Sequence, residues 1–160
     1  MANIKETILN RLAAELESTI SAFSALKPQD WLAVIYTDGA AWTPREILAH
    51  QVTTEIAIRV LVENILAGGA GAPEGFQIQK FNEEQAAERA GRPAEELYAE
   101  FRAARAALIA TVERMAPEDF ARTGRHPWFG QAALEDVLKL VYRHNMLHVR
   151  DVQHAVRARP

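Results

Sequence analysis

Four long segments in which apolar residues recur every three to four positions constrain the fold of this chain more than any other feature. They cover residues 3–26, 43–67, 93–115 and 131–157. This spacing is typical of an amphipathic α-helix that turns one face toward a core. Four such helices in one chain predict an all-α protein, a four-helix bundle.

The ends of the second segment are the best marked. It opens with a capping box at residues 43–46 (Thr-Pro-Arg-Glu), with proline at the first helical position, and it stops before glycines at 68 and 69. The chain then runs through a stretch rich in glycine, alanine and proline, followed by a short extra helix expected at 81–89. This long crossover between the second and third helices predicts a bundle that is not simply up-down-up-down.

The remaining segments are predicted to be loops. The apolar run 32–36 is short and lies between helix-ending residues, so we expect a loop or one turn of helix packed on the bundle. Residues 124–128 are expected to form a loop before the last helix, because strand signals are weak throughout the chain.

Length, charge and hydropathy narrow the class of protein. With 160 residues, the chain is expected to form one domain, 1–160. Its formal net charge of -3 lacks the basic excess of a protein that mainly binds nucleic acid. The sequence has no apolar run near the ~20 residues of a membrane span, and its N-terminus shows no secretory signal pattern. We therefore expect a cytoplasmic protein that acts on a small-molecule substrate, with no nucleic-acid or membrane partner.

Two histidines on the last helix point to metal binding. His144 and His148 are four residues apart, so they lie on one helix face, and that face belongs to the apolar stripe. Imidazoles on adjacent turns can converge on one ion at about 2.0–2.1 Å. The alternative is a pair of core histidines hydrogen-bonded to their neighbours, although two charged imidazoles side by side would repel each other.

A third histidine, His50, lies on the expected core side of the second helix. Three imidazoles with an open position form a known type of catalytic metal site. Thr54, Glu55, Asn145 and Asp151 are within reach of these histidines by helix spacing. They would serve either as a second shell of hydrogen-bond partners for the ligands or as ordinary helix-surface residues.

The other two histidines and the absence of cysteine limit which side chains can take part in the site. His126, in the loop before the last helix, and His154, rotated away from the shared face, are both expected to be exposed. The chain contains no cysteine. A thiolate ligand is therefore excluded, and any thiol in the chemistry must come from outside the protein.

Two motifs resemble the DinB-like superfamily. Residues 42–50, Trp-Thr-Pro-Arg-Glu-Ile-Leu-Ala-His, are similar to the start of its second helix, and residues 144–151, His-Asn-Met-Leu-His-Val-Arg-Asp, resemble its HxxxH helix. The resemblance covers nearly the whole chain. It implies a DinB/YfiT-like bundle, often a homodimer, with one divalent metal ion on His50, His144 and His148. The sequence departs from the pattern at Asp151, where relatives commonly have glutamine.

The resemblance also suggests an activity. Some relatives are similar to thiol-dependent transferases and isomerases that use bacillithiol, mycothiol or glutathione. A metal ion on three neutral imidazoles keeps its positive charge and lowers the pKa of a bound water or thiol. Our first hypothesis is therefore metal-dependent transfer of an external low-molecular-weight thiol to a small electrophile. Hydrolysis by a metal-bound hydroxide and a non-catalytic, stress-related binding bundle are the alternatives. Zinc and nickel are the expected ions, with iron, manganese and copper as alternatives.

Overall fold

The computed structural model describes residues 3–159, most of which are helical. The elements, with η for a 3₁₀ turn, are α1 (Ile4–Ser24), η1 (Asp30–Leu32), α2 (Pro44–Leu66), α3 (Ile78–Ala90), α4 (Ala94–Arg114), η2 (Pro117–Ala121), β1 (Thr123–His126), β2 (Gly130–Ala133) and α5 (Leu134–Arg157). The four long helices predicted from periodicity are confirmed, with ends within three residues of those predicted. Within residues 3–159, none of the helices is both long and apolar enough to cross a membrane.

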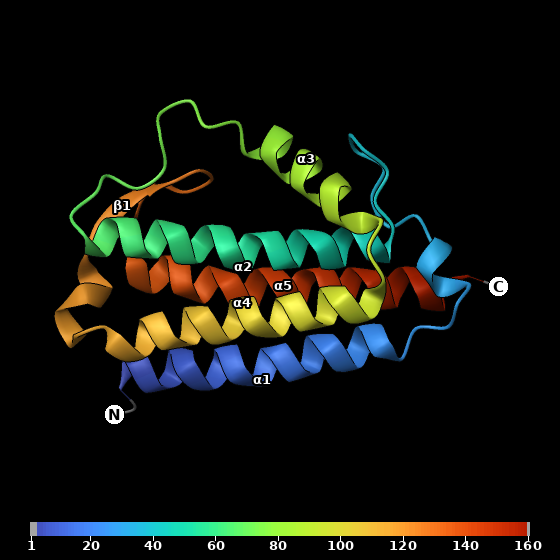
Figure 1. The fold of residues 1–160 in the computed structure, drawn as a ribbon, viewed down its shortest axis with the longest axis horizontal. Helices are drawn as coiled ribbons and strands as arrows, with labels where there is room; N and C mark the ends of the chain where they lie inside the picture. The colour runs from blue at the N-terminus through green and yellow to red at the C-terminus, as the bar shows by residue number, and fades with distance from the viewer. Residues whose placement is uncertain (1–2, 160) are drawn as a thin grey trace.

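Helices α1, α2, α4 and α5 form a four-helix bundle (Figure 1). Both α1 and α2 pack against α4 and α5, so α1 and α2 lie diagonally across the core. Helices α1 and α5 run in one direction, and α2 and α4 run in the other. The connection from α2 to α4 therefore returns along the whole bundle and carries α3 across the outside of α2. This arrangement confirms the predicted long crossover.

The segment before the last helix is a β-hairpin, so the loop predicted at 124–128 was wrong. Strands β1 and β2 pair antiparallel, from Thr123 opposite Ala133 to His126 opposite Gly130, and α5 consequently starts three residues later than predicted. Gly130 adopts a φ of +70°, which favours glycine, and so permits the tight turn. Apart from Thr123, the strands contain none of the β-branched or large aromatic residues that mark strands in a sequence.

His126 is buried in this hairpin, which corrects the prediction that it is exposed. Only 7% of its surface is accessible. Its Nδ1 accepts hydrogen bonds from the backbone N–H groups of Trp128 (3.1 Å) and Phe129 (3.3 Å), which form the turn. The imidazole therefore satisfies two backbone donors that a hairpin of this length leaves unpaired. His154, by contrast, is exposed on α5, as predicted.

The apolar run 32–36 packs on the bundle as a loop, as expected, but it also carries a structural pairing. Tyr36 and Trp42 form an isolated antiparallel bridge, and the N–H of Ile35 donates to the carbonyl of Trp42 at 2.8 Å. The two halves of the bundle thus follow one plan. In each, a helix is followed by a 3₁₀ turn, an antiparallel pairing and a histidine-bearing helix.

A layer of polar side chains divides the core into two apolar clusters. One cluster surrounds the C-terminal half of α2 and the other its N-terminal half. Between them, each bundle helix contributes one side chain that is at most 5% exposed, and together these form what we call the polar layer: Glu15, Glu55, Arg105 and Asn145. Asn145 directly follows His144, so the polar layer lies at the level of the predicted metal site.

Candidate metal centre

His50, His144 and His148 converge on one point between α2 and α5. His50 lies in the second turn of α2, whose start is fixed by the predicted capping box. The other two histidines face it from the middle of α5, which runs antiparallel to α2. Nε2 of His144 lies 3.2 Å from Nε2 of His50 and 2.9 Å from Nε2 of His148. The three ring planes meet at angles between 73° and 87°. Each imidazole thus points one nitrogen at a common centre.

These nitrogen separations match those of metal ligands. Donors about 2.0–2.1 Å from one ion lie about 2.9 Å apart at a right angle and about 3.4 Å apart at the tetrahedral angle. The two measured separations fall within this range. Among the His, Asp and Glu side chains of residues 3–159, this is the one group of three whose donor atoms all lie within 4.8 Å. The three histidines therefore fit a divalent ion, and within the described residues the group includes no fourth histidine, aspartate or glutamate.

Burial keeps the three imidazoles neutral. It lowers the pKa of His50 well below its ordinary value, and the neighbouring His144 and His148 lower it further. Burial also lowers the pKa of His148 to about 3 and lowers that of His144. Because histidine binds metal ions in its neutral form, these side chains are ready to accept a cation at neutral pH.

Tyr36 joins the histidines from the loop before α2. Its Oη lies 2.8 Å from Nδ1 of His148, and its hydroxyl donates to Oδ2 of Asp151 at 2.7 Å. Asp151 therefore reaches His148 through Tyr36. The sequence reading missed Tyr36 because it is 112 residues from His148 along the chain and belongs to no motif. Its place at the end of an apolar run was the only local signal.

The other residues within reach by helix spacing, Glu55 among them, lie elsewhere. Asn145 is fully buried, and its Nδ2 donates to Glu55 at 3.1 Å and to Glu15 at 3.4 Å, which places it in the polar layer. Thr54 is half-buried one turn after His50. Within residues 3–159, the hydrogen bonds of the three histidines include none from Thr54.

The Nδ1 atom, which points away from the common centre, has a different environment in His50 and His144 than in His148. Nδ1 of His50 and Nδ1 of His144 are buried and have no hydrogen-bond partner in the described chain. The ring of Trp42 packs against His50, with 5.0 Å between ring centroids. His50 is therefore held by packing, whereas His148 is held by a hydrogen bond.

Beside the histidines, the polar layer is a buried ion-pair network. Arg105 donates to both carboxylate oxygens of Glu55, at 2.9 and 2.7 Å, and to Oε2 of Glu15 at 2.6 Å. Burial raises the pKa of Glu55, although its contacts with Arg105 oppose this shift. The sequence reading missed this network. A signal was present, because Arg105 follows Phe101 by four residues and so interrupts the apolar stripe of its helix.

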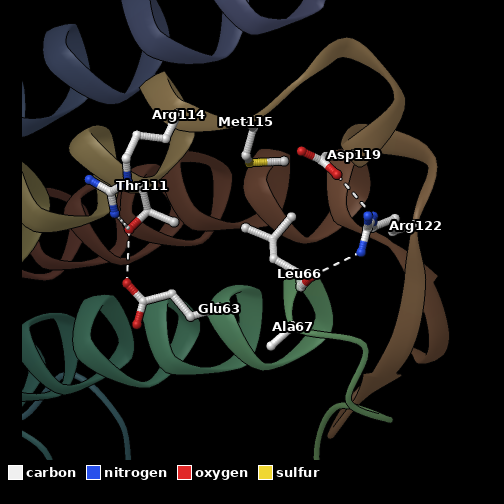
Figure 2. Close-up of a pocket in the computed structure, with 8 residues that line it drawn as sticks. All are labelled: Glu63, Leu66, Ala67, Thr111, Arg114, Met115, Asp119 and Arg122. Atoms are coloured by element: carbon white, nitrogen blue, oxygen red, sulfur yellow. Dashed lines mark hydrogen bonds and ion pairs between the residues drawn. The ribbon is translucent and has the colours of Figure 1, made fainter.

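A groove of about 440 Å³ lies at the opposite end of α2 (Figure 2). Its charged side chains already have hydrogen-bond or ion-pair partners. Glu63 accepts a hydrogen bond from Thr111 at 3.0 Å, and Arg122 donates to the carbonyl of Leu66 and pairs with Asp119, both at 2.9 Å. Glu63 lies about 20 Å from His50 along the helix axis. The groove and the three histidines are therefore separate sites.

Comparison with known families supports the fold. A family model described as the DinB superfamily matches residues 9–152. Among curated proteins, none matches the chain significantly.

Several solved structures share the architecture. YfiT from Bacillus subtilis, described as a probable metal-dependent hydrolase with an unusual four-helix bundle topology, is similar with a TM-score of 0.80 and 16% identity, over 96% of this chain and 86% of its own. A mycothiol-dependent maleylpyruvate isomerase is similar with a TM-score of 0.74 and 15% identity, over 95% of this chain and 63% of its own, so this chain spans less than two thirds of that enzyme. ClbS, a colibactin self-resistance protein whose structure contains double-stranded DNA, has a TM-score of 0.74 and 10% identity, over 98% of this chain and 97% of its own. These TM-scores show a shared fold, and the family match over most of the sequence shows that the chain belongs to the DinB superfamily.

Proposed function

We propose that this protein binds one divalent metal ion on His50, His144 and His148 and transfers an external low-molecular-weight thiol to a small electrophile. The convergence of three neutral imidazole nitrogens, without a carboxylate in the set, is the observation that carries this proposal. Such ligands add no negative charge, so the centre attracts an anion such as a thiolate. Because the chain contains no cysteine, the thiol must come from solution.

A divalent ion held here would supply one element of chemistry, a lower pKa for an approaching thiol. The protein's own residues provide position and shielding. Tyr36 holds the ring of His148, and Trp42 covers one side of His50. Zinc and nickel are the first candidates for the ion.

Hydrolysis at the same centre is the second candidate. The similarity to YfiT, described as a probable metal-dependent hydrolase, favours it. A hydrolase also needs a base beside the attacking water. Asp151, the carboxylate connected to the histidines, is engaged by Tyr36 on the side of His148 that faces away from the centre. We therefore rank thiol transfer first. The net charge of -3 gives no support to DNA binding of the kind seen in the ClbS structure.

Elemental analysis and a transfer assay test the proposal. Wild-type protein should carry about one equivalent of a divalent metal, as expected for one three-histidine site, and the His50→Ala and His148→Ala variants should lose it. His154→Ala makes the same change at an exposed position of α5 and should keep the metal. Metal-loaded protein should conjugate bacillithiol, mycothiol or glutathione to 1-chloro-2,4-dinitrobenzene faster than buffer does. Equal metal in wild type and His50→Ala would rule out the site, and turnover of esters without any thiol would favour hydrolysis.

A further inference from the structure

We propose that Tyr36 is a positioning residue of the metal centre and that it fixes the ring of His148 by connecting it to the carboxylate of Asp151. This inference rests on the proposed metal site. It adds to that site a residue from outside the two helices that carry the histidines, and it gives Asp151 an indirect part in metal binding.

The donors and acceptors along this contact have one consistent arrangement. An ionised carboxylate only accepts hydrogen bonds, so Asp151 takes the hydroxyl proton of Tyr36. Oη of Tyr36 can then only accept from Nδ1 of His148, 2.8 Å away. The proton of the imidazole therefore lies on Nδ1, and the lone pair of Nε2 faces the other two histidines. Tyr36 thus selects the tautomer of His148 that can bind an ion through Nε2.

The backbone holds Tyr36 in this place. Its carbonyl accepts a hydrogen bond from the N–H of Trp42 at 3.1 Å, within the bridge that closes the loop. The ring of Tyr36 meets the ring of His148 edge-on, with 5.6 Å between centroids, while Trp42 packs on His50. One short loop therefore contacts a histidine on each of the two metal-site helices and leads directly into the start of α2. A shift of Tyr36 would have to disturb both contacts.

The effect of Tyr36 should be large because the other two ligands lack such a partner. In the described chain, Nδ1 of His50 and of His144 have no hydrogen-bond partner, whereas Nδ1 of His148 has Tyr36. Loss of a partner of this kind typically lowers metal affinity about 10- to 100-fold. We expect that loss for Tyr36→Phe. Asp151→Asn should cost less, because an amide oxygen can still accept from the tyrosine.

The affinity of the protein for zinc is measured by competition with a chromophoric chelator, starting from metal-free protein. The visible spectrum of protein saturated with Co²⁺ reports the arrangement of the ligands independently of activity. Tyr36→Phe should weaken zinc binding and alter the cobalt spectrum. Tyr98→Phe removes the hydroxyl of a buried tyrosine on α4 and should change neither. Because Asp151 acts through Tyr36, adding Asp151→Asn to Tyr36→Phe should cause no further loss.

The outcomes separate this proposal from the metal site on which it rests. If His50→Ala loses zinc while Tyr36→Phe keeps wild-type affinity and the wild-type cobalt spectrum, the role of Tyr36 is overturned and the metal site stands. If His50→Ala keeps zinc, the metal site itself is wrong. Should Tyr36→Phe fail to fold, Asp151→Ala decides alone, because alanine cannot accept from the tyrosine and the side chain at this position is 35% exposed and tolerates change. Unchanged zinc affinity in that variant would overturn the connection.

Discussion

Two buried polar clusters lie at the same level of the bundle, and they differ in whether they contain a positive charge. In the polar layer, the guanidinium of Arg105 lies between the carboxylates of Glu15 and Glu55. In the metal centre, three imidazoles face one another, and within residues 3–159 their hydrogen bonds include none with a lysine or arginine. The clusters are adjacent in sequence as well as in space, since Asn145 follows His144.

This difference shows which cluster the chain completes by itself. Buried acceptors that face one another are unfavourable unless a donor or a cation lies between them. Arg105 meets that need for the two carboxylates. Nε2 atoms 2.9 and 3.2 Å apart can share at most one proton between each pair. In our proposal the metal centre is therefore completed by a cation from solution, and the two clusters should respond in opposite ways when a cation is removed or added.

The largest effect should come from removing the cation of the polar layer. Arg105→Met leaves two carboxylates buried without a counter-charge, and breaking a buried ion pair in this way costs about 3–5 kcal/mol in the free energy of unfolding. Urea unfolding followed by circular dichroism measures it. Arg102→Met on the same helix removes a half-exposed pair with Glu17 and should cost less than about 1 kcal/mol. Similar losses in the two variants would show that the polar layer is not an essential ion-pair network.

Adding a cation to the metal centre should have the next largest effect, with the opposite sign. Zinc at a hundred times its dissociation constant should raise the free energy of unfolding of wild type by about 2.7 kcal/mol. His50→Ala should show no such rise, and His154→Ala should behave as wild type. The measurement is the unfolding free energy with and without zinc. Equal stabilisation of His50→Ala would mean that zinc binds elsewhere.

Removing an anion from the polar layer should cost less than removing its cation. Glu55→Gln still leaves Arg105 paired with Glu15, so we expect a loss of about 1.5–3 kcal/mol, the usual range for a hydrogen bond to a charged group. Burial raises the pKa of Glu55 in the folded protein. Wild type therefore gains stability relative to Glu55→Gln as pH falls through the folded pKa toward the unfolded one. Urea unfolding of both proteins from pH 7 to pH 5 checks this. A stability difference that shrinks as pH falls contradicts it.

The sequence predicted the features that depend on spacing within one helix. It did not reveal the contacts that packing makes between distant segments. The spacing of His144 and His148 is set within one helix, so their shared face followed directly. His50 was assigned to the same site mainly through the family resemblance. The sequence of a single helix does not determine which of its turns packs beside which turn of another helix. Tyr36 meets His148 across 112 residues, and only the folded loop brings it there. Arg105 interrupts the apolar periodicity of its own helix, but its carboxylate partners come from two other helices and could not be identified from that signal.

The smallest effect is expected where the two clusters touch. Gln51 follows His50, is fully buried, and donates from Nε2 to the backbone carbonyl of Asn145 at 3.3 Å. That bond is long, and Oε1 of Gln51 has no partner within the described residues. Gln51→Met has a similar length and removes both groups, so it should change the free energy of unfolding by less than about 1 kcal/mol. Zinc affinity should stay within about threefold of wild type, well short of the 10- to 100-fold loss typical for a ligand's own hydrogen-bond partner, because within the described residues the hydrogen bonds of the three histidines include none with Gln51. A tenfold loss of zinc affinity at unchanged stability would instead show that the polar layer positions the metal centre through this one side chain.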